Sequence, residues 1–159
     1  MARQTIAYRG PAAHVSLLVQ MLEEDGQEII WERPAEARGT SEIAETVVAQ
    51  LVAVGTWEGA KAAVARFRGR AGGRASVVVA GDGGFEFDSW WPGLTDAQRT
   101  EARELDEDAI MPSWLIQSLH RQGVAIIMPN GGEGSISERP EDGGSPLPDQ
   151  IYDAIHRAA

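Results

Sequence analysis

Between residues 4 and 88 the sequence alternates short β-forming runs with amphipathic segments, and this order limits the fold more than any other feature. Short apolar or alternating runs predict strands at 4–8, 27–32 and 75–80. The last of these, Ala-Ser-Val-Val-Val-Ala, is the clearest because three consecutive valines strongly favour a strand. The chain is therefore expected to build a β-sheet from short segments.

Two helices are predicted between these strands. The first begins near Pro11, a residue that suits a first helical turn, and ends at Gly26. Its apolar face is formed by residues spaced three and four apart, namely Val15, Leu18, Val19 and Leu22. The second helix follows Thr56, which can cap it, and runs from Trp57 to about Arg70.

The segment 42–54 leaves two alternatives open. Its apolar residues have helical spacing, but many of them are β-branched, which favours a strand. A strand is preferred because strand 27–32 needs a neighbour. Phe85 to Asp88 alternates after a glycine-rich turn and is predicted to be a hairpin partner of strand 75–80.

The resulting order is strand, helix, strand, strand, helix, strand, followed by one hairpin strand. This is the split β-α-β order of ferredoxin-like folds, so the expected class is α+β. Residues 1–88 form this core, and residues 89–159 are expected to be an acidic helical extension packed on it as one compact unit. The segments of the extension are a charged helix from Thr95 to about Asp108, a helix from Pro112 to Gly123, a strand at 124–128, a Gly/Pro-rich loop at 129–148 and a terminal helix from Pro148.

Charge and composition exclude several classes of protein. The net charge of −10 falls entirely on residues 81–159, where fifteen acids face five bases, and this argues against a nucleic-acid partner. The chain has no cysteine, so disulfides, thiolate–metal sites and thiol nucleophiles are excluded. No apolar run could span a bilayer, and residues 1–5 do not begin a secretory signal, so a cytoplasmic protein without membrane contact is expected.

No motif in the sequence carries recognisable chemistry, and no cofactor or metal is expected. His14, His120 and His156 are isolated, without metal-ligand spacing. The glycines at 131–134 lack the lysine and the following helix of a phosphate loop. The carboxylates between Glu101 and Asp108 do not match a calcium loop and are interpreted as a solvated helix face.

Two apolar groups are candidates for a protein interface. Trp90 and Trp91 are adjacent, and if they continued a strand their side chains would point to opposite faces. One would then cover the core, and the other could anchor a partner. Ile151, Tyr152 and Ile155 form an apolar stripe on the terminal helix, which is too short to be stable alone and must dock on its own chain or on a neighbour.

Residues 43–79, from Ile-Ala-Glu-Thr-Val-Val through Ala-Lys-Ala-Ala-Val-Ala-Arg-Phe-Arg to Ser-Val-Val-Val, resemble small actinobacterial effector-associated modules of the ferredoxin-like kind. The resemblance covers residues 4–88 and implies an adaptor that acts beside signalling or defence effectors.

The preferred function is therefore a non-enzymatic interaction module of a bacterial cytoplasmic system, which binds a protein with a basic surface. One alternative is a structural component of a phage or related particle that forms homo-oligomers. The other is an enzyme whose site assembles from scattered groups such as Asp88 and His120.

Overall fold

The computed structural model describes residues 2–33, 46–71, 75–81, 85–107, 109–127 and 145–158. In chain order the elements are β1 (Ala2–Pro11), α1 (His14–Glu24), β2 (Glu28–Arg33), β3 (Thr46–Gly55), α2 (Trp57–Ala71), β4 (Ser76–Gly81), α3 (Phe87–Trp90), the 3-10 helix η2 (Trp91–Gly93), α4 (Asp96–Arg103), α5 (Ser113–Arg121), β5 (Ala125–Ile127) and α7 (Asp149–Arg157). The mixture of helices with one antiparallel sheet makes the fold α+β.

The strands form a five-stranded sheet in the order β2-β3-β1-β4-β5. Every neighbouring pair is antiparallel. β1 lies at the centre and pairs with β3 from Ala2↔Gly55 to Pro11↔Thr46. β2 and β5 are the two edges, so the last strand of the sheet comes from the second half of the chain.

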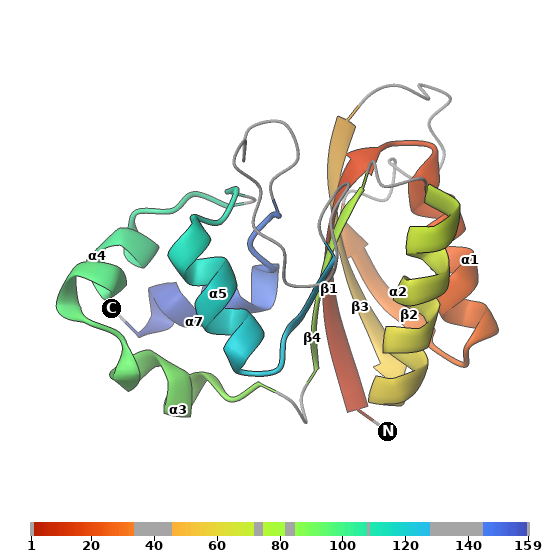
Figure 1. Ribbon diagram of the computed structural model, residues 1–159. Coiled ribbons are helices and arrows are strands. Elements are labelled where there is room, and N and C mark those ends of the chain that lie inside the picture. Colours follow the sequence, from red (N-terminus) through yellow and green to blue (C-terminus); the bar gives the residue numbers. More distant parts are fainter. Residues whose placement is uncertain are drawn as a thin grey trace.

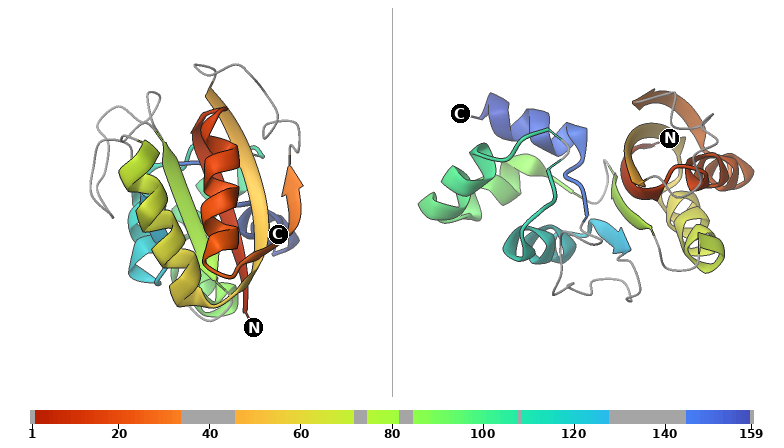
Figure 2. Two further views of the ribbon diagram at one scale, coloured as in Figure 1. Left: turned by 90° about the vertical axis from the view of Figure 1, so that its right-hand side faces the viewer. Right: turned by 90° about the horizontal axis from the view of Figure 1, so that it is seen from above.

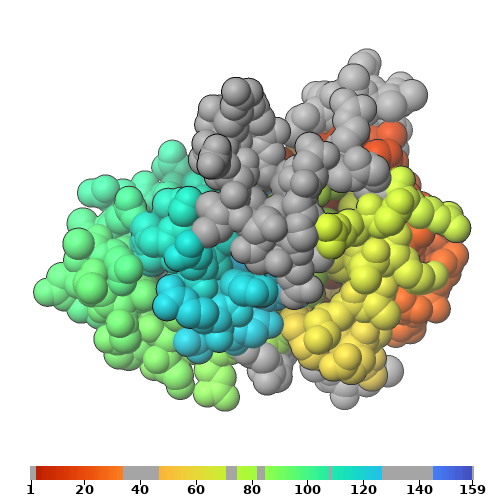
Figure 3. All heavy atoms as spheres, viewed as in Figure 1, coloured from red at the N-terminus to blue at the C-terminus, as the bar shows by residue number. Residues whose placement is uncertain are grey.

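Helices cover both faces of this sheet. α1 and α2 lie on one face, whereas α3, α4, α5 and α7 lie beyond the other (Figure 1). Viewed from the α1 side, β2 stands at one edge of the sheet (Figure 2). The space-filling view shows the outer surface of α5 in cyan toward the left and that of α2 in yellow toward the right (Figure 3).

Each face has its own hydrophobic core. The first core joins the sheet to α1 and α2 and includes the buried side chains of Ile6, Leu51, Phe67 and Val79. The second core lies on the opposite face and is built from Val78 and from side chains of the later helices. β4 contributes to both cores, which explains why its valines are consecutive rather than alternating with polar residues.

Local sequence signals set the ends of several elements where they were expected. Gly26 and Gly123 have φ values of 86° and 96°, the left-handed conformation that commonly ends a helix. Thr56 Oγ1 accepts a hydrogen bond from the amide of Gly59 at 3.0 Å and so caps α2. Thr95 and Gln98 form the predicted capping box at the start of α4.

Most predicted segments are confirmed, including the strand alternative for 42–54 over its described residues. The helix from Thr95 is shorter than expected, because α4 ends at Arg103. Pro11 belongs to β1 and does not open α1, which begins at His14. Residues 129–144 of the predicted loop 129–148 lie outside the described residues.

The predicted hairpin strand at Phe85–Asp88 is wrong. Phe87 begins the short helix α3, and the edge of β4 pairs with β5 through Val77↔Ile127, Val78↔Ile126 and Val79↔Ala125. Phe85 and Phe87 pack on the second core, so they do not share a face with Val77 and Val79. Because β5 occupies this edge of β4, no position is left there for a local hairpin strand.

Within the described ranges, none of the helices has the length and apolar character that crossing a lipid bilayer would require.

The first prediction concerns Val79, which is fully buried in the first core and pairs with Ile6. Val79→Asp places an unpaired carboxylate there and is expected to lower the free energy of unfolding by about 3–5 kcal/mol. Urea unfolding followed by circular dichroism measures the loss. The control is Val54→Asp on the half-buried end of β3, where a smaller loss is expected. Equal stability of the wild type and Val79→Asp would contradict the assigned register.

The second prediction concerns Tyr8, whose hydroxyl donates a hydrogen bond to the Pro11 carbonyl at 2.6 Å. Burial raises the pKa of this phenol above its ordinary value, because the phenolate is poorly solvated in the core. The unfolded chain therefore releases the Tyr8 proton first, from about pH 10 upward, and stability falls as the pH rises further. In Tyr8→Phe this part of the decline is expected to be absent. Chemical unfolding between about pH 9 and pH 11 measures it, and parallel declines in both proteins would refute the assignment.

Candidate interaction site

A β-bulge interrupts the edge strand β2. The register runs from Glu28↔Val54 and Ile29↔Ala53 to Trp31↔Val52, so Ile30 has no partner on β3. Residues paired across two strands point to the same face of a sheet. Ala53 belongs to the first core and Val52 lines a groove on the other face, so the bulge separates the directions of Ile29 and Trp31.

The bulge has a definite consequence for the two residues that follow it. In a regular strand Trp31 would share the face of Ile29 and point toward α1. The extra residue moves Trp31 and Arg33 to the opposite face, where both line the groove. Bulges commonly redirect side chains in this way next to functional sites. Ile30 and Trp31 are the large apolar side chains that the described structure leaves most exposed, at 46% and 44%.

The groove lies between the β2 side of the sheet and α7 and has a volume of about 410 Å³. Its residues come from β1, β2, β3, α7 and the segment after α4, namely Arg3, Thr5, Trp31, Arg33, Val52, Glu107, Asp149, Gln150 and Asp153. It exists because the helices of the second face cover β4 and leave much of β3 and β2 open. This volume is in the range typical of binding sites.

Polar contacts hold the first turn of α7 against the sheet. Arg33 makes a bidentate pair with Asp149, with Nε–Oδ2 at 3.1 Å and Nη2–Oδ1 at 2.9 Å. Glu107 lies 3.7 Å from the same guanidinium. Thr5 donates a hydrogen bond to the side chain of Gln150. The bidentate pair holds Asp149, and with it the start of α7, beside the Arg33 side chain, which the bulge directs to this face.

A fully buried glutamine of β3, Gln50, binds the backbone at the start of α7. Gln50 donates through Nε2 to the Leu147 carbonyl at 3.1 Å and accepts from the Asp149 amide through Oε1, also at 3.1 Å. The Asp149 amide is at the start of α7, where backbone donors lack partners within the helix. The Gln50 side chain therefore satisfies one backbone carbonyl just before α7 and one backbone amide in its first turn.

Trp31 differs from the other tryptophans. Lys61 lies over the ring of Trp57, Trp114 donates to Glu101, and Trp90 and Trp91 contact other aromatic rings. Among the described residues, Trp31 has no ring partner, no indole hydrogen bond and no cation over its face. Within the described part of the chain, the indole is thus an aromatic surface of the groove without a ring, hydrogen-bond or cation partner.

The candidate interface residues named from the sequence do not line this groove. Trp90, Trp91, Ile151 and Ile155 are buried in the second core, and Tyr152 is partly buried against it. They therefore do not form an exposed surface. The argument from strand alternation fails because this segment is helical, and successive side chains of a helix can both pack inward. The terminal helix docks on its own chain.

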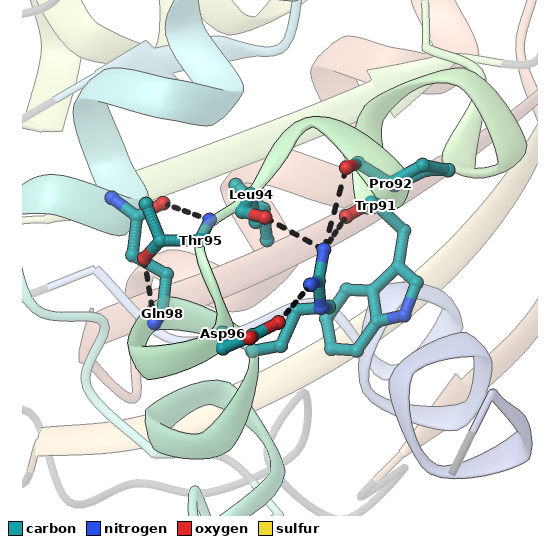
Figure 4. Close-up of polar contacts among 7 residues, drawn as sticks. Trp91, Pro92, Leu94, Thr95, Asp96 and Gln98 are labelled. Atoms are coloured by element: carbon teal, nitrogen blue, oxygen red, sulfur yellow. Dashed lines mark hydrogen bonds and ion pairs between the residues drawn. The ribbon is translucent and has the colours of Figure 1, made fainter.

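Arginine contacts fix the turn that follows these tryptophans. Arg99 Nη1 donates to the carbonyl oxygens of Trp91, Pro92 and Leu94 at 3.4, 3.3 and 2.6 Å, and its Nη2 pairs with Asp96 (Figure 4). The Trp90 indole donates to Ser118 on α5 at 2.7 Å. The double-tryptophan segment is therefore part of the intramolecular core.

The residues considered for catalysis are dispersed. Asp88 and His120 are exposed on α3 and α5, and His14 lies on α1, across the sheet from both. His156 packs on Tyr152 with ring centroids 4.3 Å apart. Among the residues that the structure describes, no three His, Asp or Glu side chains gather closely enough to hold a metal ion.

Comparison with known proteins finds no match to this chain, whether among family models, curated proteins or solved structures.

Trp31 is not among the candidate interface residues named from the sequence, so the groove was missed at that level. A signal was nevertheless present, because Ile29-Ile30-Trp31 puts three large apolar residues in succession where a half-buried strand should alternate. Such a run is also produced by a strand buried on both faces. Only the position of β2 at the sheet edge distinguishes these two cases.

The third prediction tests the support beneath the groove. Gln50→Leu leaves the Leu147 carbonyl and the Asp149 amide unpaired and is expected to lower the free energy of unfolding by about 1–3 kcal/mol. Urea unfolding measures this loss. The matched control is Gln20→Leu, because Gln20 lies on the exposed face of α1, where its side chain donates a hydrogen bond to Glu24. A change within about 0.5 kcal/mol is expected there. Equal effects at both positions would contradict the supporting role.

Proposed function

We propose that this chain is a non-enzymatic protein-interaction module and that its partner binds the groove between β2 and α7. The observation that carries the proposal is the exposure of Ile30 and Trp31 side by side on an edge strand, beside a groove toward which a bulge directs Trp31. Edge strands of soluble proteins are normally protected by charge, because exposed apolar edges associate. Tryptophan is also among the residues that contribute most to binding energy at protein interfaces.

We further propose that β1 to β4, with α1 and α2, form a ferredoxin-like unit to which β5 and the later helices are added. The strand order β2-β3-β1-β4, its antiparallel pairing and the position of both helices on one face support this assignment. An adaptor role, as in the effector-associated modules that residues 4–88 resemble, is consistent with an exposed apolar edge strand beside the groove.

The fourth prediction tests the groove as a binding site. A displayed library of random peptides is selected on the immobilised full chain, and the selected clones are then bound to Trp31→Ala and to His120→Ala. Most clones are expected to lose at least about tenfold in affinity for Trp31→Ala, because removal of a central tryptophan from an interface costs about 2 kcal/mol or more. The His120 variant is the control, since His120 is exposed on α5, away from the groove.

Two results would contradict the proposal. One is a selection that yields no specific clones. The other is a set of clones that binds Trp31→Ala as tightly as the wild type, which would place the interaction surface elsewhere. Circular dichroism of both variants separates loss of binding from loss of folding.

A further inference from the structure

The chemistry of the groove indicates what kind of partner it accepts. Three carboxylates and two guanidiniums line it, so its formal charge is −1. Asp149 is already paired with Arg33, which leaves Asp153 and the half-exposed Glu107 as the carboxylates most available to a ligand. Arg3 lies at one end of the groove. Glu28 lies on the same face of the sheet, because Arg3 and Glu28 both pair with Val54 on β3.

The open ring of Trp31 adds a second recognition element. The face of an indole attracts cations, and a cation over Trp is more strongly bound than one over Tyr or Phe. This chain uses the same interaction internally, because Lys61 lies 5.6 Å from the ring of Trp57 and Arg103 lies 5.3 Å from that of Trp91. Trp31 offers such a surface without a described cation, in the groove that the carboxylate of Asp153 also lines.

The length of the groove suits an extended chain. Its residues follow β3 from the level of Val54, opposite Arg3, to that of Gln50, opposite Arg33. Four residues of strand span about 13 Å, which matches an extended peptide of about four residues. The net charge of −10 adds a long-range field that attracts a basic segment to this surface.

We infer that the groove binds an extended basic segment of the partner protein, with an arginine or lysine side chain over the ring of Trp31 and its charge directed to Asp153 and Glu107. This inference rests on the proposed function and specifies the chemistry of the partner. The guanidinium of Arg33 does not oppose it, because the bidentate pair with Asp149 neutralises that charge. Val52 on the floor provides the apolar contact for the stem of the long side chain.

The fifth prediction compares three peptide pools with the ¹⁵N-labelled full chain. The pools share mixed apolar residues at alternate positions and carry arginine, glutamine or glutamate at the others. The indole N–H signal of Trp31, assigned by its absence in Trp31→Phe, is expected to shift with the arginine pool. Affinity for that pool should exceed affinity for the glutamate pool by at least about tenfold and should fall as salt is added.

Matched variants test the role of the carboxylates. Asp153→Asn and Glu107→Gln are each expected to weaken binding of the arginine pool by about two- to fivefold, the usual effect of a partly exposed ion pair. Glu58→Gln serves as the control, since Glu58 is an exposed carboxylate on α2, beyond the opposite face of the sheet. Its affinity should equal that of the wild type.

The outcomes separate this inference from the proposed function. If the glutamine or glutamate pool binds at Trp31 as tightly as the arginine pool, the basic partner is refuted while the groove remains the interaction site. If none of the pools shifts the Trp31 signal, the basic segment is refuted as well, and failure of the peptide selection would then refute the groove itself. Unchanged binding in both carboxylate variants would overturn the assigned contacts of the cation.

Discussion

The pairing of β1 with β3 is the constraint on which the rest of the structure depends. Its antiparallel register extends over the full length of both strands and places β1 at the centre of the sheet. β4 then pairs with the other edge of β1. Both β1 and β4 therefore lie inside the sheet and have two faces to bury. One layer of helices cannot cover two faces, so the second half of the chain must supply the other layer and the strand β5.

The second layer covers the sheet unevenly, and the groove results from this. Its core involves β4, β5 and part of β1, whereas β3 and β2 keep an open surface beside α7. The wall of that surface is determined by polar contacts, with Gln50 and Arg33 holding the start of α7. Apolar packing places the helix on the sheet, and directional hydrogen bonds set the position of its first turn.

Exposed aromatic surface is costly in water, so its position in the fold is informative. Four of the five tryptophans have ring, indole or cation contacts within the chain. The fifth lies where a bulge changes the face toward which it points, next to carboxylates and on an edge strand. This combination is the basis of the proposed recognition of another chain, and the histidines and Asp88 lie on separate helices away from it.

Local sequence determined the elements whose signals are themselves local. Periodic apolar residues, the glycines at 26 and 123 and the capping box at Thr95 act within a few residues, and strands β1 to β4 were predicted on the same basis. Tertiary structure decided the rest, since pairing β4 with β5 replaced the expected hairpin, and packing on the opposite core buried Trp90 and Trp91. The bulge at Ile30 is the clearest case. One unpaired residue reverses the face of every later side chain in its strand, and that reversal depends on the register with β3, which no local pattern encodes.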